Sequence, residues 1–490
     1  MTERKPTEMF SSRWALVLAA LGMAIGTGNI WRFPRVAAEN GGGAFLIPWL
    51  IFLFLWSIPL LMVEFAMGKS TRLGVIGAFG KALGMRYVWM GAFVAFCTTA
   101  IMFYYSVVTG WAVKYAVGSI TGSLWTTEGS AYWESFLSSG WQPILFHAVA
   151  ITGTALIVGR GVVRGIEVAN RILIPLLVLL LGVMAVKVLS LPRATTGLEY
   201  LFAPDFEKLA DYKVWLAALS QSAWSTGAGW GLLLTYAVYM RTREDITINA
   251  FLCGLGNNSA SLLSAIVIVP TVFALQPGAT EALAVLAAGN EGLAFTWIPN
   301  LFREMTGGRV FMPVFFVALC VAAVSSLIAM VELAVRVLMD FGLERRRAIA
   351  AVAVTAFLCG IPSALSIDFF KNQDWVWGLG LMVSGAFFAF AAIRFGLERM
   401  RNEILNADGS DMHVGRWFTV FVMFLVPLEF VAMIAWWFGT TIASSSVSQW
   451  ADPLGKFSVG TCLAQWAIIV VTFMLANAWL GRRVLGKEAS

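Results

Sequence analysis

The sequence predicts an all-α integral membrane protein with about twelve transmembrane helices. Of its 490 residues, 59% are hydrophobic and only 13% are charged, and the mean hydropathy is +0.78. Soluble chains are about 25% charged, so this composition leaves too little polar surface to cover a protein in water. Apolar runs of about 20 residues, the length that crosses a bilayer, recur along the whole chain. They leave no room for a large soluble domain.

Each predicted span is an apolar run that is long enough to cross the membrane as a helix. In order, the spans are 13–37, 43–68, 87–117, 142–159, 165–190, 212–240, 246–275, 308–342, 346–364, 373–398, 415–440 and 460–484. Basic residues collect at alternate ends of the spans, at Arg13, Lys69, Arg72, Arg160, Arg164, Arg241, Arg345, Arg399 and Arg482. Because cytoplasmic loops carry an excess of Lys and Arg, both termini are expected in the cytoplasm. The segment 118–141 contains Glu but no Lys or Arg, as an outer loop would.

The remaining composition mainly excludes other classes of protein. The five Cys lie in apolar runs without C-x-x-C spacing, so neither a disulfide framework nor a zinc site is expected. Only two His are present, with no spacing that is typical of a catalytic triad or a metalloprotease, and we do not expect an enzyme. The net charge of +6 follows from the membrane topology and calls for no nucleic-acid partner. Short loops favour a bacterial inner membrane.

Glycine clusters interrupt the first and sixth spans at mid-membrane depth. One is the stretch Gly22–Asn29 with three glycines, and the other is the stretch Ser225–Gly231. Glycine weakens a helix by about 1 kcal/mol relative to alanine, so both stretches are candidate unwound segments. Either cluster alone is equally well explained by close helix packing through small residues. Together they fall where two five-helix repeats would each begin, which is typical of a transporter binding site.

This symmetry divides the chain into a first inverted repeat over 1–205, a second over 206–400, and two additional helices over 401–490. Half-helix N-termini at the breaks offer N–H groups to an anion, while unwound carbonyl groups suit a cation. The arrangement therefore predicts that a substrate with a carboxylate moves together with Na⁺.

The sequence around the first break resembles the signature of the neurotransmitter:sodium symporter family. The resemblance rests on Gly26–Pro34 (GTGNIWRFP) and on Glu39–Phe45 (ENGGGAF), and it extends to the third, sixth, seventh, eighth and tenth spans. It implies alternating access, in which helices 1, 2, 6 and 7 rock against the remainder.

Two sodium sites follow from the resemblance. The first would use Ala24, Asn29, Ser225 and Asn257, and the second Gly22, Ile25, Ala322, Ser325 and Ser326. Without the resemblance, a Ser-Ser pair in an apolar helix more often bonds to its own helix. A chloride site beside the first sodium would use Trp49, Gln221, Ser225 and Ser261. Ser261 stands where chloride-independent relatives carry Glu, whereas Trp49 departs from the usual Tyr and is only a donor.

The resemblance also implies a substrate pocket. Its lining would be Met23, Ala24, Thr27, Gly28, Ile101, Tyr105, Trp224, Ser225, Gly227, Trp230, Ser326 and Met330. Tyr105 would donate to the substrate carboxylate. Met23 and Trp224 depart from the family pattern. Trp224 and Tyr105 form an aromatic pair that would attract a substrate ammonium through cation–π contact; alternatively, Trp224 and Met23 simply fill volume and favour a small substrate.

Gates are implied on both sides of the pocket. Arg32 and Asp374 match the outer pair, and Tyr239 and Asp340 match residues of the cytoplasmic gate. The usual Arg and Trp partners of that gate are replaced by Thr7 and Phe10, for which Arg4 or Lys5 could substitute. Glu64 matches a carboxylate that caps the unwound sixth helix. Glu332 and Arg336, four residues apart, are expected to pair locally.

We therefore predict a Na⁺-coupled symporter that imports a small amino acid or related zwitterion, with Cl⁻ as a second ion. We expect the protein to lie in the lipid bilayer, and the sequence leaves open whether it forms a homodimer. Two alternatives remain from the sequence: a proton-coupled carrier of the same fold, and a substrate sensor that does not transport.

Overall fold

The structure, a computed structural model, describes residues 8–407 and 410–486. Throughout these residues the regular structure is helical and contains no strand longer than the isolated bridge between Gly42 and Pro204. Ten helices are long and apolar enough to cross a membrane. The prediction of an all-α membrane protein is thus confirmed.

The spanning helices follow the predicted order closely. They are α3 to α4 (Gly43–Thr71), η3 to α6 (Met85–Thr121), α9 (Trp141–Gly159), η4 to α10 (Val162–Leu189), α14 (Ile246–Leu275), α18 (Gly308–Asp340), α19 (Arg345–Leu365), α20 (Ile367–Phe395), α22 to α23 (Trp417–Ala443) and α25 (Val459–Leu485). Shorter helices connect them, including α5 (Val75–Leu83), α7 (Ser123–Thr126), α8 (Gly129–Ser138), α11 (Ala194–Phe202), α15 (Ala279–Leu286), α17 (Ile298–Glu304), α21 (Leu397–Arg399) and α24 (Val447–Trp450).

The two remaining predicted spans are broken. In the first, α1 (Arg13–Ala24) and the segment Gly28–Glu39, which ends in α2 (Phe33–Glu39), meet at an angle of 57°. In the sixth, the segment 226–231 separates α12 (Tyr212–Ser225) from α13 (Leu232–Ala237). At 14 and 6 residues, α12 and α13 are each too short to cross a bilayer alone. Both predicted interruptions are therefore present, and they explain why fewer than twelve continuous spans appear.

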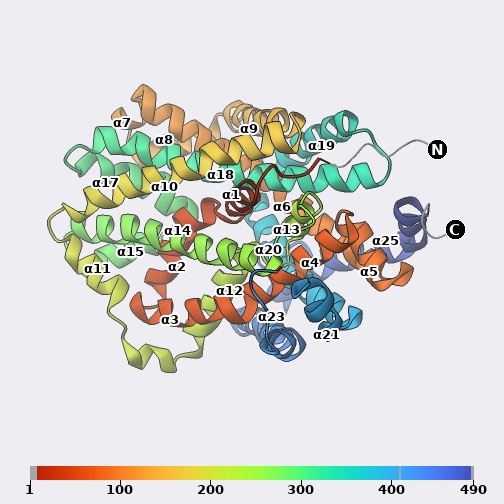
Figure 1. Cartoon of the computed structure of the whole chain (residues 1–490). Helices are drawn as coiled ribbons and strands as arrows, with labels where there is room; N and C mark the ends of the chain where they lie inside the picture. The colour runs from red at the N-terminus through yellow and green to blue at the C-terminus, as the bar shows by residue number, and fades with distance from the viewer. Residues whose placement is uncertain (1–7, 408–409, 487–490) are drawn as a thin grey trace.

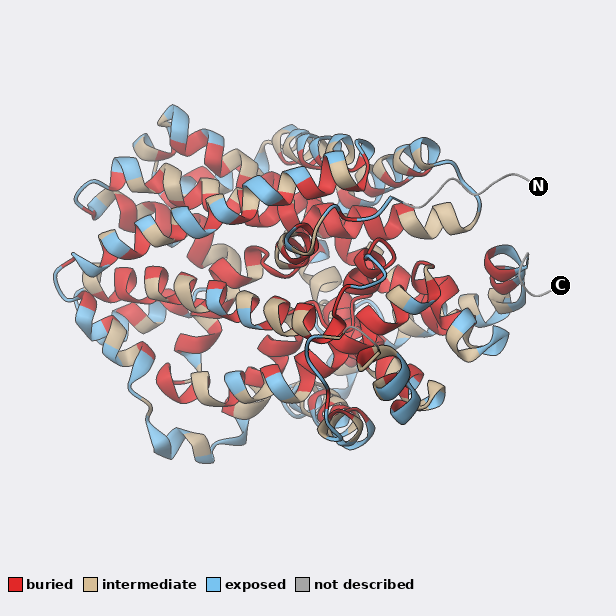
Figure 2. Ribbon diagram, viewed as in Figure 1, coloured by how far each residue is buried: buried red, intermediate tan, exposed pale blue. Residues whose placement is uncertain are grey.

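The broken helices lie at the centre of the molecule. In Figure 1, α1 lies among α10, α13, α14 and α18, which pack against it, with α23 and α25 at the edge. Burial follows this arrangement in Figure 2: 78% of the most apolar part of α18 is buried, compared with 17% for α25. The outer helices present apolar faces outward, as a protein in lipid does.

Candidate substrate and ion sites at the broken helices

The break after α1 turns backbone polar groups away from the helix. Ile25 adopts an extended conformation (φ −82°, ψ 95°), and the N–H of Gly26 donates to Oδ1 of Asn29 at 2.8 Å. Oγ of Ser326 on α18 lies 3.1 to 3.3 Å from the carbonyl oxygens of Gly22, Met23 and Ile25, to one of which it can donate its single proton. Carbonyl groups that lack helical partners are thereby directed toward α18.

The break between α12 and α13 depends on glycine. Gly227, Gly229 and Gly231 have φ values of +71°, +88° and +77°, a region that residues with a side chain rarely adopt. The freed N–H groups are satisfied by Glu64 of α4, which is fully buried. Its carboxylate accepts from the N–H of Gly229 at 2.7 Å and from that of Leu234 at 3.2 Å. Glu64 therefore lies where the sequence resemblance places it.

Oxygen-bearing groups gather between α1, α12 and α14. The side-chain amide of Asn257 lies 3.1 Å from the carbonyl oxygen of Ala24 and 3.0 Å from that of Ser225, and it donates to both when its nitrogen faces them. Nδ2 of Asn29 lies 3.1 Å from Oγ of Ser225, 2.8 Å from Oγ of Ser261 and 2.7 Å from the Asn257 amide. The four residues predicted for the first sodium are thus brought together.

A second group of oxygen atoms lies between α1 and α18. Oγ of Ser325 donates to the Ala322 carbonyl oxygen at 3.0 Å and lies 3.5 Å from that of Ile25. With the Ser326 contacts to Gly22 and Ile25, all five residues predicted for the second sodium form one cluster. Ser325 does bond to its own helix, as an isolated Ser-Ser pair would, but it also reaches across to α1.

A cavity lies beside both oxygen clusters, and all twelve residues predicted for the substrate pocket line it. The wall also includes residues that the sequence did not assign to the pocket: Gly26, Asn29, Trp31, Arg32, Tyr104, Val108, Leu232, Asn290, Glu291, Phe370 and Asp374. A largely apolar wall with a few converging polar groups is typical of a small-molecule site.

Aromatic side chains shape this cavity. The hydroxyl of Tyr105 lies 3.1 Å from the backbone N of Thr27 and 3.3 Å from its Oγ1, at the break of α1. Trp224 and Trp230 meet edge to face, with 5.9 Å between ring centroids. Sδ of Met23 lies 2.7 Å from the point that a Cβ at Gly227 would occupy, so Met23 fills the space that a larger residue at 227 would need.

The two residues of the predicted outer gate do not form an ion pair with each other. Arg32 and Asp374 both line the cavity, but no ion pair within 4.0 Å joins them among the described residues. Instead, the guanidinium of Arg32 lies 4.7 Å from the ring centroid of Trp224, a cation–π contact. The predicted bridge is therefore not formed in this conformation, because the Arg32 side chain is placed over the indole.

The residues of the predicted cytoplasmic gate have partners that the sequence did not indicate. Glu332 is fully buried and pairs with Arg345 at 2.7 Å, and it accepts from the hydroxyl of Tyr239 at 2.6 Å. Arg336 instead pairs with Asp340 at 2.9 Å. The predicted local pair of Glu332 with Arg336 is thus wrong, because each side chain has a nearer partner. The sequence features that could have indicated the pair of Glu332 with Arg345 are a Glu within an apolar span and the basic run that follows that span.

The other predicted residues of this gate lie close to that network. Oδ2 of Asp340 accepts from the N–H of Gly74 at 2.6 Å. The N–H of Phe10 donates to the Tyr239 carbonyl oxygen at 3.0 Å, and its ring packs edge to face on Tyr236. Thr7, Arg4 and Lys5 lie outside the described residues.

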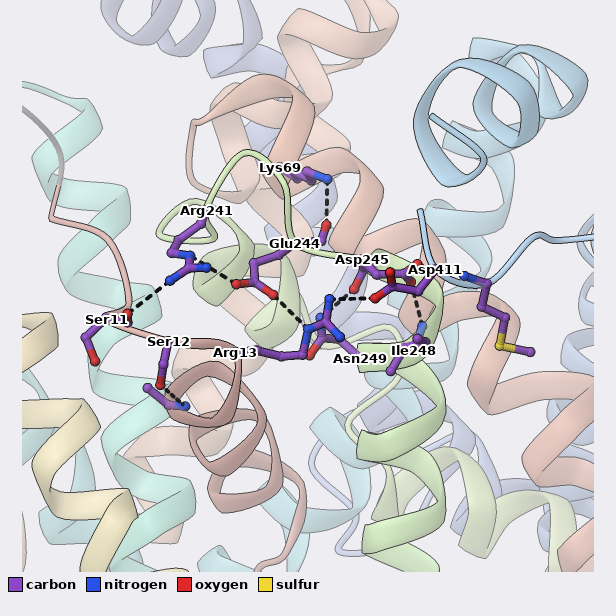
Figure 3. Close-up of polar contacts among 12 residues, drawn as sticks. Ser11, Ser12, Arg13, Lys69, Arg241, Glu244, Asp245, Ile248, Asn249 and Asp411 are labelled. Carbon is purple, nitrogen blue, oxygen red and sulfur yellow. Dashed lines mark hydrogen bonds and ion pairs between the residues drawn. The ribbon is translucent and has the colours of Figure 1, made fainter. Parts of the chain in front are cut away.

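Charged groups also hold the start of α1 against neighbouring loops, as Figure 3 shows. Arg13 contacts Glu244 at 3.2 Å and Asp411 at 2.7 Å. Arg241 donates to the Ser11 carbonyl oxygen at 3.1 Å, and Lys69 donates to that of Glu244 at 2.7 Å. These contacts close the end of α1 that the positive-inside rule assigns to the cytoplasm.

The predicted chloride residues are only partly assembled. Ser225 and Ser261 meet around Asn29, as described above. Trp49 packs against Phe33 with the rings tilted by 43° and their centroids 4.5 Å apart, and its buried Nε1 lacks a hydrogen-bond partner in the part of the chain described here. Oε1 of Gln221 is likewise buried and unpartnered there.

These features together define a secondary transporter, in which two broken helices enclose a central cavity flanked by oxygen clusters. The model of the Sodium:neurotransmitter symporter family matches residues 7–142 and 140–481. The chain belongs to this family, whose members are transporters rather than enzymes.

Relatives and a solved structure agree with this assignment. An uncharacterised sodium-dependent transporter of Methanocaldococcus jannaschii is 32% identical over 87% of this chain and 89% of its own length. The sodium-dependent serotonin transporter of Drosophila melanogaster is 26% identical over 84% of this chain and 73% of its own. The crystal structure of MhsT in complex with L-phenylalanine superposes with a TM-score of 0.77 at 30% identity, over 87% of this chain and 99% of that one. The protein is a multi-pass membrane protein of a family of Na⁺-coupled symporters.

Proposed function

We propose that the protein imports a small amino acid or related zwitterion, driven by Na⁺ and accompanied by Cl⁻. The observation that carries this proposal is the pair of oxygen clusters beside one cavity. Carbonyl, carboxamide and hydroxyl oxygens are the ligands that hard cations take, and both clusters offer them from more than one helix. The shell of Ala24, Asn29, Ser225 and Asn257 suits a hard cation. The shell of Gly22, Ile25, Ala322, Ser325 and Ser326 suits a second.

The cavity supports a zwitterionic substrate with an apolar side chain. Tyr105 and the backbone N–H groups at the α1 break provide donors for a carboxylate, close to the first oxygen cluster. Met23, Ile101, Trp230 and Met330, each at most 6% exposed, provide the apolar wall. MhsT holds L-phenylalanine, an amino acid with such a side chain. Inward movement of each Na⁺ down a membrane potential of 100 mV supplies about 2.3 kcal/mol.

The transport cycle rests on the repeat division proposed from the sequence, 1–205, 206–400 and 401–490. We propose that α1, α4, α12 and α14 rock against the other helices between an outer gate at Arg32 and Asp374 and a cytoplasmic gate at Tyr239 and Asp340. We also propose that the protein lies in a bacterial inner membrane with both termini in the cytoplasm.

Uptake into proteoliposomes tests the function directly. We expect labelled amino acids, taurine and betaines to include at least one substrate whose uptake requires Na⁺ and falls when gluconate replaces Cl⁻. Uptake that persists in choline chloride and responds to pH would instead favour a proton-coupled carrier. Substrate binding without concentrative uptake would favour the sensor. Equal uptake in sodium gluconate and NaCl would remove the chloride proposal alone.

Ser261→Glu tests the chloride proposal at one residue. Ser261 lies against Asn29, so a carboxylate there would supply the negative charge that we assign to Cl⁻ beside the first sodium. We expect uptake by the natural protein to fall about fivefold or more in sodium gluconate, and uptake by the variant to be the same in both salts. Ser261→Gln, which adds a similar volume at the same position without the charge, should still require Cl⁻. A Ser261→Glu variant that still requires Cl⁻ would contradict the assignment.

A further inference from the structure

Asn170 is a buried polar residue whose side chain uses only part of its hydrogen-bonding capacity. It lies on α10, is 0% exposed, and its Nδ2 donates to the Ile166 carbonyl oxygen at 2.9 Å. Its Oδ1 has no hydrogen-bond partner among the described residues. Turning the amide over would place Oδ1 against the Ile166 oxygen, so the orientation is fixed. An unsatisfied buried acceptor is costly, so a cation that reached this oxygen would offset that cost.

The Asn170 oxygen points at Gly22, one of the residues assigned to the second sodium. A Cβ at Gly22 would lie 1.9 Å from Oδ1 and 2.8 Å from Cγ of Asn170. The amide therefore occupies the space that a side chain at 22 would take. Since α10 packs against both α1 and α18, it borders the two helices that contribute the second oxygen cluster.

A second buried polar residue lies beyond Asn170, toward the cytoplasmic end of α1. Glu167, three residues earlier and 2% exposed, faces the segment before α1, where it accepts from the N–H of Ser11 at 3.0 Å and from its hydroxyl. Arg171 also contacts Glu167, at 2.7 Å, and its side chain is 59% exposed. An uncharged oxygen and then a carboxylate thus lie between the Gly22 backbone and the surface.

We propose that Asn170 is a transient ligand of Na⁺, whose side-chain oxygen takes the ion from the Gly22 carbonyl as it leaves toward Glu167 and the cytoplasm. This inference rests on the second sodium site proposed above. Release of Na⁺ is needed for net uptake. Release of Na⁺ is not needed for substrate exchange when Na⁺ is saturating on both sides. A defect in Na⁺ release should therefore slow net uptake but not exchange.

The test uses the full chain in proteoliposomes. Asn170→Leu removes the oxygen while nearly keeping the volume; we expect net uptake to slow about fivefold or more, with exchange within about twofold of the natural protein. Asn170→Asp keeps the shape and adds a charge. It should lower the Na⁺ concentration for half-maximal substrate binding by about threefold or more, while net uptake slows because Na⁺ is held longer.

Asn249 provides a matched control, because it is also buried, donates from Nδ2 to the carbonyl oxygen four residues earlier, and has an unpartnered Oδ1. Asn249→Leu should slow exchange and net uptake by the same factor, if at all. The proposal is overturned if Asn170→Leu does the same, or if Asn170→Asp leaves the Na⁺ dependence of binding unchanged. A natural protein whose substrate binding ignores Na⁺ would instead overturn the proposed function.

Discussion

Replacing Asn29 with alanine is expected to reduce Na⁺-driven uptake by about 100-fold, on the order of 3 kcal/mol of lost stabilisation. Asn29 joins the three elements of the first oxygen cluster: its Oδ1 holds the N–H of Gly26 at the α1 break, and its Nδ2 faces Ser225, Asn257 and Ser261. Alanine removes both a proposed sodium ligand and the bond that fixes the break. Uptake driven by an imposed Na⁺ gradient measures the loss.

Folding must be separated from ion binding in this experiment. The elution profile of the solubilised variant should match that of the natural protein, since Asn29 is one polar residue in a large apolar core. Ser259→Ala changes an exposed hydroxyl on α14 and should transport normally. Ser326→Ala, which removes a hydroxyl from the second cluster, is also expected to abolish Na⁺-driven uptake. Normal uptake by either the Asn29 or the Ser326 variant would show that the sodium assignment is wrong.

Replacing Glu64 with alanine is expected to prevent stable folding. The carboxylate accepts from the backbone N–H of Gly229 in the unwound segment and from that of Leu234 in the first turn of α13. Without it these groups are buried with no acceptor, and each costs several kcal/mol in a membrane interior. We expect a loss of monodisperse protein on size exclusion. Glu64→Gln, which keeps one acceptor oxygen, should give an intermediate result.

Glu429 offers a contrast within the same protein. It lies on α23 and is 8% exposed, and its Oε2 has no partner among the described residues. Glu429→Gln should therefore leave the thermal stability of the solubilised protein unchanged or raised, because it removes a poorly satisfied carboxylate. Equal loss of stability in the Glu64 and Glu429 variants would mean that the Glu64 bonds to the unwound segment are not the cause.

Much of the site could be predicted because it depends on local backbone chemistry. The glycines at 22–28 and 227–231 mark positions where a helix is weak and φ can be positive, so the breaks follow from residue type. Once the breaks were located, the family resemblance assigned the residues around them. All twelve pocket residues line one cavity, and both sodium sets converge.

Side-chain partners between distant helices could not be predicted in the same way. Glu332 and Arg336 are correctly spaced for a pair on one helix, yet Glu332 contacts Arg345 and Tyr239, and Arg336 contacts Asp340. Arg32 lies over Trp224 rather than beside Asp374. In each case several partners are within reach, and the choice depends on distances that only the packed helices set.

The sequence by itself determined that this is a membrane protein with about twelve spans and two broken helices, because hydropathy, the positive-inside pattern and glycine content act over short stretches of chain. The tertiary structure alone decided which oxygen atoms face one another across α1, α12, α14 and α18, and that Asn170 fills the space beside Gly22. The physical reason is that a polar contact between distant residues depends on helix packing to within an ångström. Helix formation in lipid, in contrast, depends on the local sequence, because each segment must satisfy its own backbone hydrogen bonds.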